Sequence, residues 1–177
     1  AYAVYSTEQE ASVTTAEGKT TCYDTLANAI SAANDGDTVT LLKDVTVSDE
    51  NKGDTNGILT ITKKIILDGN GKTITSGQNR DTAKKASVIN VENATVTIKD
   101  LTINSNNAAK HGLNLYGATV TVENVTIKDG TGYGVVCNSS ILNATNLNTS
   151  GNGWGGVNVD TKIANKGSSF TMTSGTI

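Results

Sequence analysis

Three short stretches, Gly112-Leu-Asn-Leu-Tyr116, Gly134-Val-Val-Cys-Asn138 and Gly156-Val-Asn-Val-Asp160, follow one another at a constant interval, with their first residues at positions 112, 134 and 156. Each begins with glycine and carries apolar residues at its second and fourth positions, which is the period of a β-strand. Upstream, Val88-Ile-Asn-Val-Glu92 fits the same frame at a slightly longer interval. The regular spacing indicates a repeat in which one short strand recurs in every copy.

A second pattern keeps the same spacing. Val96 to Ile103 matches Val120 to Ile127, and the stretch from Leu142 to Leu147 continues the match one copy later. Phe170-Thr-Met172 extends the series after an insertion around Thr161 to Ser168. Three short strands in each copy predict a coil with three sheet faces, whose copies bury their apolar side chains by stacking at about 4.8 Å per rung.

We therefore predict an all-β, three-faced parallel β-helix of about six rungs with a short N-terminal capping helix. The inward columns of the first strand are expected to be Ile89, Leu113, Val135, Val157 and Val91, Leu115, Cys137, Val159. A β-sandwich does not require so long a constant register, and a βαβ fold needs helices that are not visible after Asn34.

The predicted organisation is one domain in two parts. Residues 1–36 hold an N-terminal segment and a helix from about Thr25 to Asn34, capped by Asp24 and stopped by Gly36. Residues 37–177 form the rungs. Met172 to Ile177 begins a further rung with no cap or charged strand to protect its edge. We expect either that the rungs continue beyond Ile177 in a longer protein or that two copies associate end to end.

Composition argues against several functions. A net charge of −3 and a pI near 5.1 disfavour nucleic acid as a partner, and the absence of any long apolar run disfavours membrane insertion. Cys22 and Cys137 lie far apart in the sequence, with no Cys/His grouping for zinc, so two buried free thiols are the preferred interpretation. No cofactor and no metal site are expected.

Two stretches carry a resemblance to a known superfamily. Tyr23 to Leu42 looks like the capping helix and first strand, and Ile65-Ile-Leu-Asp-Gly-Asn-Gly-Lys-Thr-Ile74 looks like an early rung, of the pectate-lyase-like right-handed β-helices. The combination is similar to repeats in large secreted, surface-attached bacterial proteins. The resemblance implies a right-handed coil, an adhesin-like role and an extracellular location, either secreted or on a bacterial cell surface. It does not imply one activity, because the superfamily mixes lyases, glycosidases, tailspikes and adhesins.

The sequence lacks a recognisable catalytic constellation. A pectate lyase needs a calcium site and a basic residue, but the single arginine is Arg80 and no column of Asp or Glu is predicted. Glu92 and Asp160 share a column at three rungs' separation, about 14 Å, which is too far for paired-carboxylate hydrolysis. His111 is expected to be a solvated turn residue. We expect a non-catalytic protein, the alternative being a truncated polysaccharide lyase or glycoside hydrolase whose catalytic rungs follow Ile177.

One outward face is a candidate surface for carbohydrate. Amides bind sugar hydroxyls and aromatic rings stack on sugar faces, so the partner would be a polysaccharide or a cell-surface glycan. The candidate residues are Asn90, Glu92, Asn114, Tyr116, Tyr133, Asn138, Trp154, Asn158 and Asp160. An exposed solenoid face must be polar in any case, and single exposed aromatic residues are common. Asp100, Asn124 and Asn146 form a further column, at a turn, and are predicted to be structural.

Overall fold

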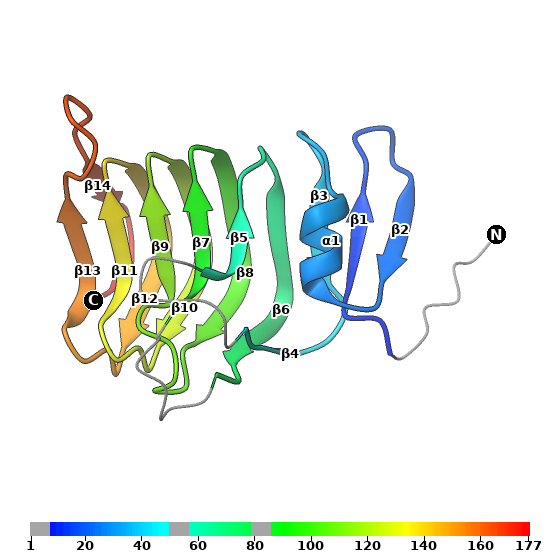
Figure 1. Ribbon diagram of the computed structural model, residues 1–177, viewed down its shortest axis with the longest axis horizontal. Helices are drawn as coiled ribbons and strands as arrows, with labels where there is room; N and C mark the ends of the chain where they lie inside the picture. Colours follow the sequence, from blue (N-terminus) through cyan, green and yellow to red (C-terminus); the bar gives the residue numbers. More distant parts are fainter. Residues whose placement is uncertain (1–7, 50–56, 79–85) are drawn as a thin grey trace.

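The computed structural model describes residues 8–49, 57–78 and 86–177, which form a parallel β-solenoid of about five turns with one short helix (Figure 1). The predicted fold class is confirmed. The sequence predicted about six rungs, and the structure has about five turns. Arg80 and residues 1–7 lie outside the described residues.

One side of the coil is a five-stranded parallel sheet in the order β5-β7-β9-β11-β13. Its strands are β5 (Gly57–Ile61), β7 (Ser87–Glu92), β9 (Leu113–Tyr116), β11 (Tyr133–Asn138) and β13 (Gly155–Asp160). Leu115 pairs with Val91 on one side and with Cys137 on the other, and Cys137 pairs with Val159. Equivalent residues of successive copies therefore lie over one another, as the repeat predicted.

The rest of the coil is a ten-stranded sheet in the order β14-β12-β10-β8-β6-β3-β1-β2, in which β15 also pairs with β12 and β4 with β6. Its strands are β1 (Ala11–Thr14), β2 (Thr20–Tyr23), β3 (Thr38–Leu41), β4 (Val45–Val47), β6 (Ile66–Ser76), β8 (Thr95–Asn104), β10 (Thr119–Lys128), β12 (Ile141–Ser150), β14 (Ser169–Met172) and β15 (Gly175–Thr176).

The long strands of this sheet bend in the middle, which is how one sheet supplies two faces of the coil. Asp100, Asn124 and Asn146 have φ values of 50°, 54° and 53°, the left-handed region that Asn and Asp tolerate best. The side chains also bond along the column: Asn124 Nδ2 donates to Asp100 Oδ1 at 3.0 Å, and Asn146 Nδ2 donates to Asn124 Oδ1 at 3.1 Å. We call these three residues the corner column.

The N-terminal end carries an antiparallel hairpin that the sequence did not predict. Strand β1 pairs antiparallel with both β2 and β3, and helix α1 (Leu26–Ala32) packs on these strands. The predicted cap was wrong: Thr25, not Asp24, accepts the N–H of Asn28. At the other end of α1, the Lys63 ammonium binds the carbonyls of Ser31 and Ala33, which have no partner within the helix.

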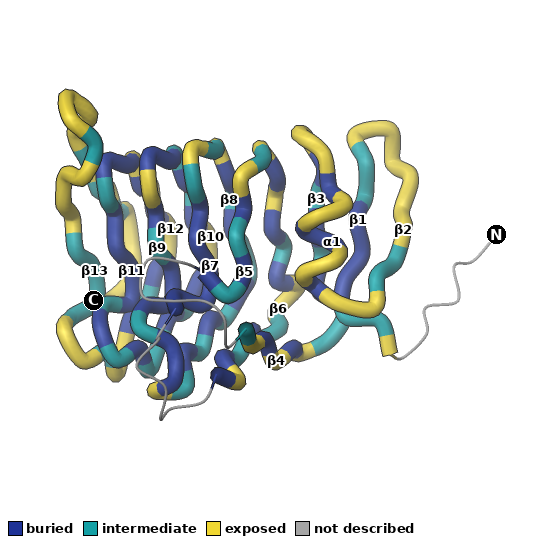
Figure 2. Tube along the Cα trace, in the orientation of Figure 1, coloured by how far each residue is buried: buried dark blue, intermediate teal, exposed yellow. Residues whose placement is uncertain are grey.

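The core is a continuous stack of aliphatic side chains inside the coil. Figure 2 shows the middle rungs mostly buried and the last rung largely half-buried or exposed. Cys137 is fully buried, and desolvation raises the pKa of its thiol, whereas Cys22 is only half-buried, contrary to the prediction; both are free. Among the described residues, no helix has the length and apolar character needed to cross a membrane.

Candidate binding groove

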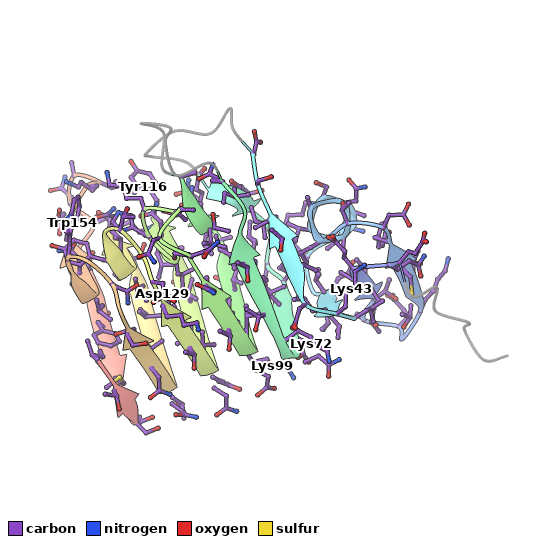
Figure 3. The ribbon with its side chains drawn as sticks, turned by 90° about the horizontal axis from the view of Figure 1, so that it is seen from below. Lys43, Lys72, Lys99, Tyr116, Asp129 and Trp154 are labelled. Carbon is purple, nitrogen blue, oxygen red and sulfur yellow. The ribbon has the colours of Figure 1, made fainter. Side chains whose placement is uncertain are left out.

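A groove of about 680 Å³ runs across the outer face of the five-stranded sheet. Its lining includes all nine residues that the sequence proposed for carbohydrate, and it adds five more, Asn93, Lys110, His111, Val136 and Lys162. Figure 3 shows Tyr116 and Trp154 on one side of the coil and Lys72 and Lys99 on the opposite side. The complete lining is Asn90, Glu92, Asn93, Lys110, His111, Asn114, Tyr116, Tyr133, Val136, Asn138, Trp154, Asn158, Asp160 and Lys162.

The floor of the groove comes from outward positions of β7, β9, β11 and β13. Asn90, Asn114, Val136 and Asn158 share one column, because the strands are in parallel register. Asn114 Nδ2 donates to Asn90 Oδ1 at 2.7 Å, and Asn90 Nδ2 donates to Glu92 Oε1 at 2.5 Å. Asn90 is only 1% exposed, so it orients Asn114 and Glu92 from beneath instead of offering its own amide to a ligand.

One wall of the groove consists of the three rings of His111, Tyr133 and Trp154, which we call the aromatic wall. The rings of His111 and Tyr133 stack with centroids 5.9 Å apart, because the two residues occupy equivalent places in successive rungs. Trp154 meets Tyr133 edge to face at 5.6 Å and His111 at 6.0 Å. The Lys110 ammonium lies 5.5 Å from the centroid of the Trp154 ring.

His111 is buried, so the prediction of a solvated turn residue was wrong. Its Nδ1 accepts the backbone N–H of Tyr133 at 2.8 Å, which fixes the orientation of the imidazole ring. Gly132 permits this packing, since a Cβ at that position would lie 2.6 Å from His111 Cε1. His111 is therefore buried by the turn of the next rung, which packs against it.

The aromatic wall ends in an exposed ring. Trp154 is 60% exposed, and Tyr116, from the floor side of the groove, is 39% exposed. The free-energy cost of exposing a side chain to water grows with its apolar area, and aromatic rings have the largest areas. Two open rings beside a run of amides can stack on sugar faces while the amides bind hydroxyls.

The insertion, residues 161–168 between β13 and β14, contributes Lys162 to the lining of the groove. The equivalent turns between β9 and β10 and between β11 and β12 are much shorter, at 117–118 and 139–140. The insertion folds back over those shorter turns. Ser139 Oγ accepts the backbone N–H groups of Lys162 and Ile163 at 2.9 and 2.7 Å, and Lys166 Nζ donates to Gly117 O at 2.6 Å.

The insertion also brings a charge pair to the end of the groove. Lys162 Nζ lies 3.1 Å from Asp160 Oδ2, and the Thr161 N–H donates to Asp160 Oδ1 at 2.7 Å. The Thr161 N–H, followed by the Lys162 ammonium, lowers the pKa of the Asp160 carboxyl.

The carboxylates of the groove are not arranged for hydrolysis. Four neighbouring strands contribute one residue each to a single outward column, in the order Glu92, Tyr116, Asn138 and Asp160. Glu92 and Asp160 are thus three rungs apart, about 14 Å at the strand spacing, beyond the separation of either glycosidase mechanism. In the described parts of the chain, no three His, Cys, Asp or Glu side chains are grouped so that they could hold a metal ion.

Comparison with known proteins adds nothing to this geometry. The chain matches no protein-family model, no curated protein and no solved structure. The structure itself shows a parallel β-solenoid.

Proposed function

We propose that this chain is a non-catalytic, adhesin-like module, secreted or carried on a bacterial cell surface, that binds a polysaccharide along the groove. The single observation behind the proposal is the convergence of the nine candidate residues on one elongated surface. The right-handed, pectate-lyase-like classification and the extracellular location belong to the same proposal.

The lining supports a sugar chain through two complementary contacts. Asn114, Asn138 and Asn158 supply amides that both donate and accept hydrogen bonds, which suits hydroxyl groups. Trp154 and Tyr116 supply open ring faces for the apolar side of a sugar. A groove that crosses four rungs accommodates an extended polymer better than a compact small molecule, because its contacts repeat at each rung.

A glycan array followed by titration calorimetry tests this proposal. We expect a polysaccharide that binds the intact chain to bind Trp154→Ala and Tyr116→Ala at least about tenfold more weakly, the loss typical of a stacking anchor. Ile141→Ala is the matched control, since Ile141 is a 44% exposed apolar residue on the ten-stranded sheet. The absence of any glycan ligand, or equal affinity in all four proteins, would refute the binding groove.

Incubation of the same preparation with polygalacturonate and calcium at alkaline pH tests the non-catalytic part. We expect no unsaturated product to accumulate. Product formation would show that the alternative, a polysaccharide lyase, is the better description of this chain.

A further inference from the structure

The charged side chains of the groove are balanced. Lys110 and Lys162 contribute two positive charges, and Glu92 and Asp160 contribute two negative charges, so the described lining has no net charge with His111 neutral. The balance is also local at one end, where Lys162 and Asp160 are 3.1 Å apart. A ligand therefore meets no excess of either sign.

The negative charges have fixed places on the floor of the groove. Glu92 is held by the amide of Asn90, and Asp160 by the Thr161 N–H and the Lys162 ammonium. Both carboxylates belong to the same column of outward residues, at its two ends. A chain lying along this column passes both of them.

Lys162 owes its place to the insertion. The short turns of the two preceding rungs bring no charged side chain to the lining, whereas the insertion is fastened to Ser139 and Gly117 by four hydrogen bonds. Without this cation the described lining would carry a net charge of −1, because Glu92 and Asp160 would face Lys110 alone. The insertion thus determines the charge of the groove.

Resting on the proposed function, we infer that the ligand is a neutral polysaccharide and that the groove discriminates against polyanionic chains such as polyuronates and sulfated glycans. A polyanion lying along the column would bring negative groups close to Glu92 and Asp160 at its two ends, and the two lysines do not provide the excess positive charge that attracts such polymers. Neutral hydroxyl groups satisfy the same amides without this repulsion.

The experiment is a glycan array that contains neutral and acidic polysaccharides, with each binder then titrated at about 50 mM and about 500 mM salt, a range over which screening of exposed charges changes strongly. We expect the binders to be neutral and their affinities to change by less than about twofold, since uncharged contacts are not screened. Acidic binders whose affinity falls steeply with salt would overturn this inference and leave the binding groove intact. No binder of any kind would overturn the proposed function itself.

One substitution sharpens the result. Asp160→Asn removes a negative charge while keeping a side chain of the same shape, so the lining gains a net charge of +1. For a neutral binder and its carboxylated derivative, we expect the ratio of affinities to shift by about fivefold toward the derivative, the size of one partly screened charge interaction. Asp68→Asn, a change on the ten-stranded sheet, should leave the ratio unchanged. An unchanged ratio in Asp160→Asn would contradict the role of groove charge.

Discussion

The two sheets of the solenoid share the same pattern of inward residues but differ in their outward residues. On both, alternate residues enter the core and pair with the equivalent residues of the neighbouring copies. The outward residues of β8 and β10 include Thr97 paired with Thr121, a small polar pair on a plain sheet surface. The outward residues of β9 and β11 line a groove together with the aromatic wall and Lys162 of the insertion.

The difference shows which positions carry information about function. The inward columns must be apolar on every face, because each rung buries them against the next. The outward positions are free of that requirement, so a cluster of large residues there is a candidate for a binding surface. The outer face of the five-stranded sheet combines a run of amides with the three clustered rings of the aromatic wall, and that face is the candidate site.

The largest expected effect is a difference in stability between substitutions at two neighbouring residues of β9, one inward and one outward. Leu115 is fully buried in an inward column, and Tyr116 points into the groove with 39% exposure. We expect Leu115→Ala to lower the free energy of unfolding by about 2–5 kcal/mol, because it leaves a cavity between two rungs. Tyr116→Ala should change stability by less than about 0.5 kcal/mol and affect only binding.

Denaturant unfolding monitored by circular dichroism measures both variants, with binding titrated on the folded fraction. If the two substitutions destabilise the protein equally, Tyr116 is part of the packing and the distinction between inward and outward residues is wrong. If folded Leu115→Ala keeps its affinity for the ligand, the inward residue acts on stability alone.

A smaller effect is expected at the corner column, which joins the two halves of each bent strand. Asn124 combines a φ of 54° with amide hydrogen bonds to Asp100 and Asn146. We expect Asn124→Ala to cost about 1–3 kcal/mol of unfolding free energy, because Ala tolerates the left-handed region poorly and lacks the amide.

Asn124→Gly separates the two contributions. Gly adopts positive φ without strain but also lacks the amide, so it should be more stable than the Ala variant by about 1 kcal/mol. If both variants are as stable as the parent chain, neither the backbone conformation nor the side-chain column stabilises the corner. Neither substitution should alter glycan affinity, because the corner lies outside the groove lining.

The sequence predicted the parts of the molecule that repeat. Leu113, Val135 and Val157 recur in register, and the outward residues of the same strands follow from simple alternation, so the floor of the groove could be located in advance. The antiparallel pairing of β1 could not, because Ala11–Thr14 has no counterpart elsewhere in the chain.

The rest of the groove was harder to predict because it is made by turns. The burial of His111 depends on the close approach of Gly132 from the next rung, a tertiary contact with no period in the sequence. The insertion at 161–168 was visible as a gap in the register. The path of the insertion depends on a hydrogen bond from Lys166 Nζ to Gly117 O, a tertiary contact that the sequence pattern does not indicate. The position of Lys162 in the groove was missed for this reason.

The smallest expected effect on stability comes from removing either of two ion pairs on opposite sides of the solenoid. Lys99 lies 3.2 Å from Asp68 on the ten-stranded sheet, and Lys162 lies 3.1 Å from Asp160 in the groove. Exposed pairs of this kind contribute little to stability, so Lys99→Gln and Lys162→Gln should be nearly indistinguishable in denaturant unfolding. They should differ in ligand selectivity, since only Lys162 contributes charge to the groove.

In each pair one partner has a shifted pKa, the lysine in the first pair and the carboxyl in the second. Asp68 raises the pKa of Lys99, by hydrogen bond and by charge, above its ordinary value of 10.5, so that pair's stabilisation is complete below pH 10.5 and is lost as the pH rises through the higher value of the folded state. Asp160 has a lowered pKa, so its stabilisation is complete well above 3.8 and is lost as the pH falls through its lower folded-state value. Unfolding of the two Gln variants and the parent chain, followed from acid to alkaline pH, should therefore converge at alkaline pH for Lys99→Gln and at acid pH for Lys162→Gln. A difference from the parent chain that persists at alkaline pH for Lys99→Gln, or at acid pH for Lys162→Gln, would show that the ion pair is not the source of that difference.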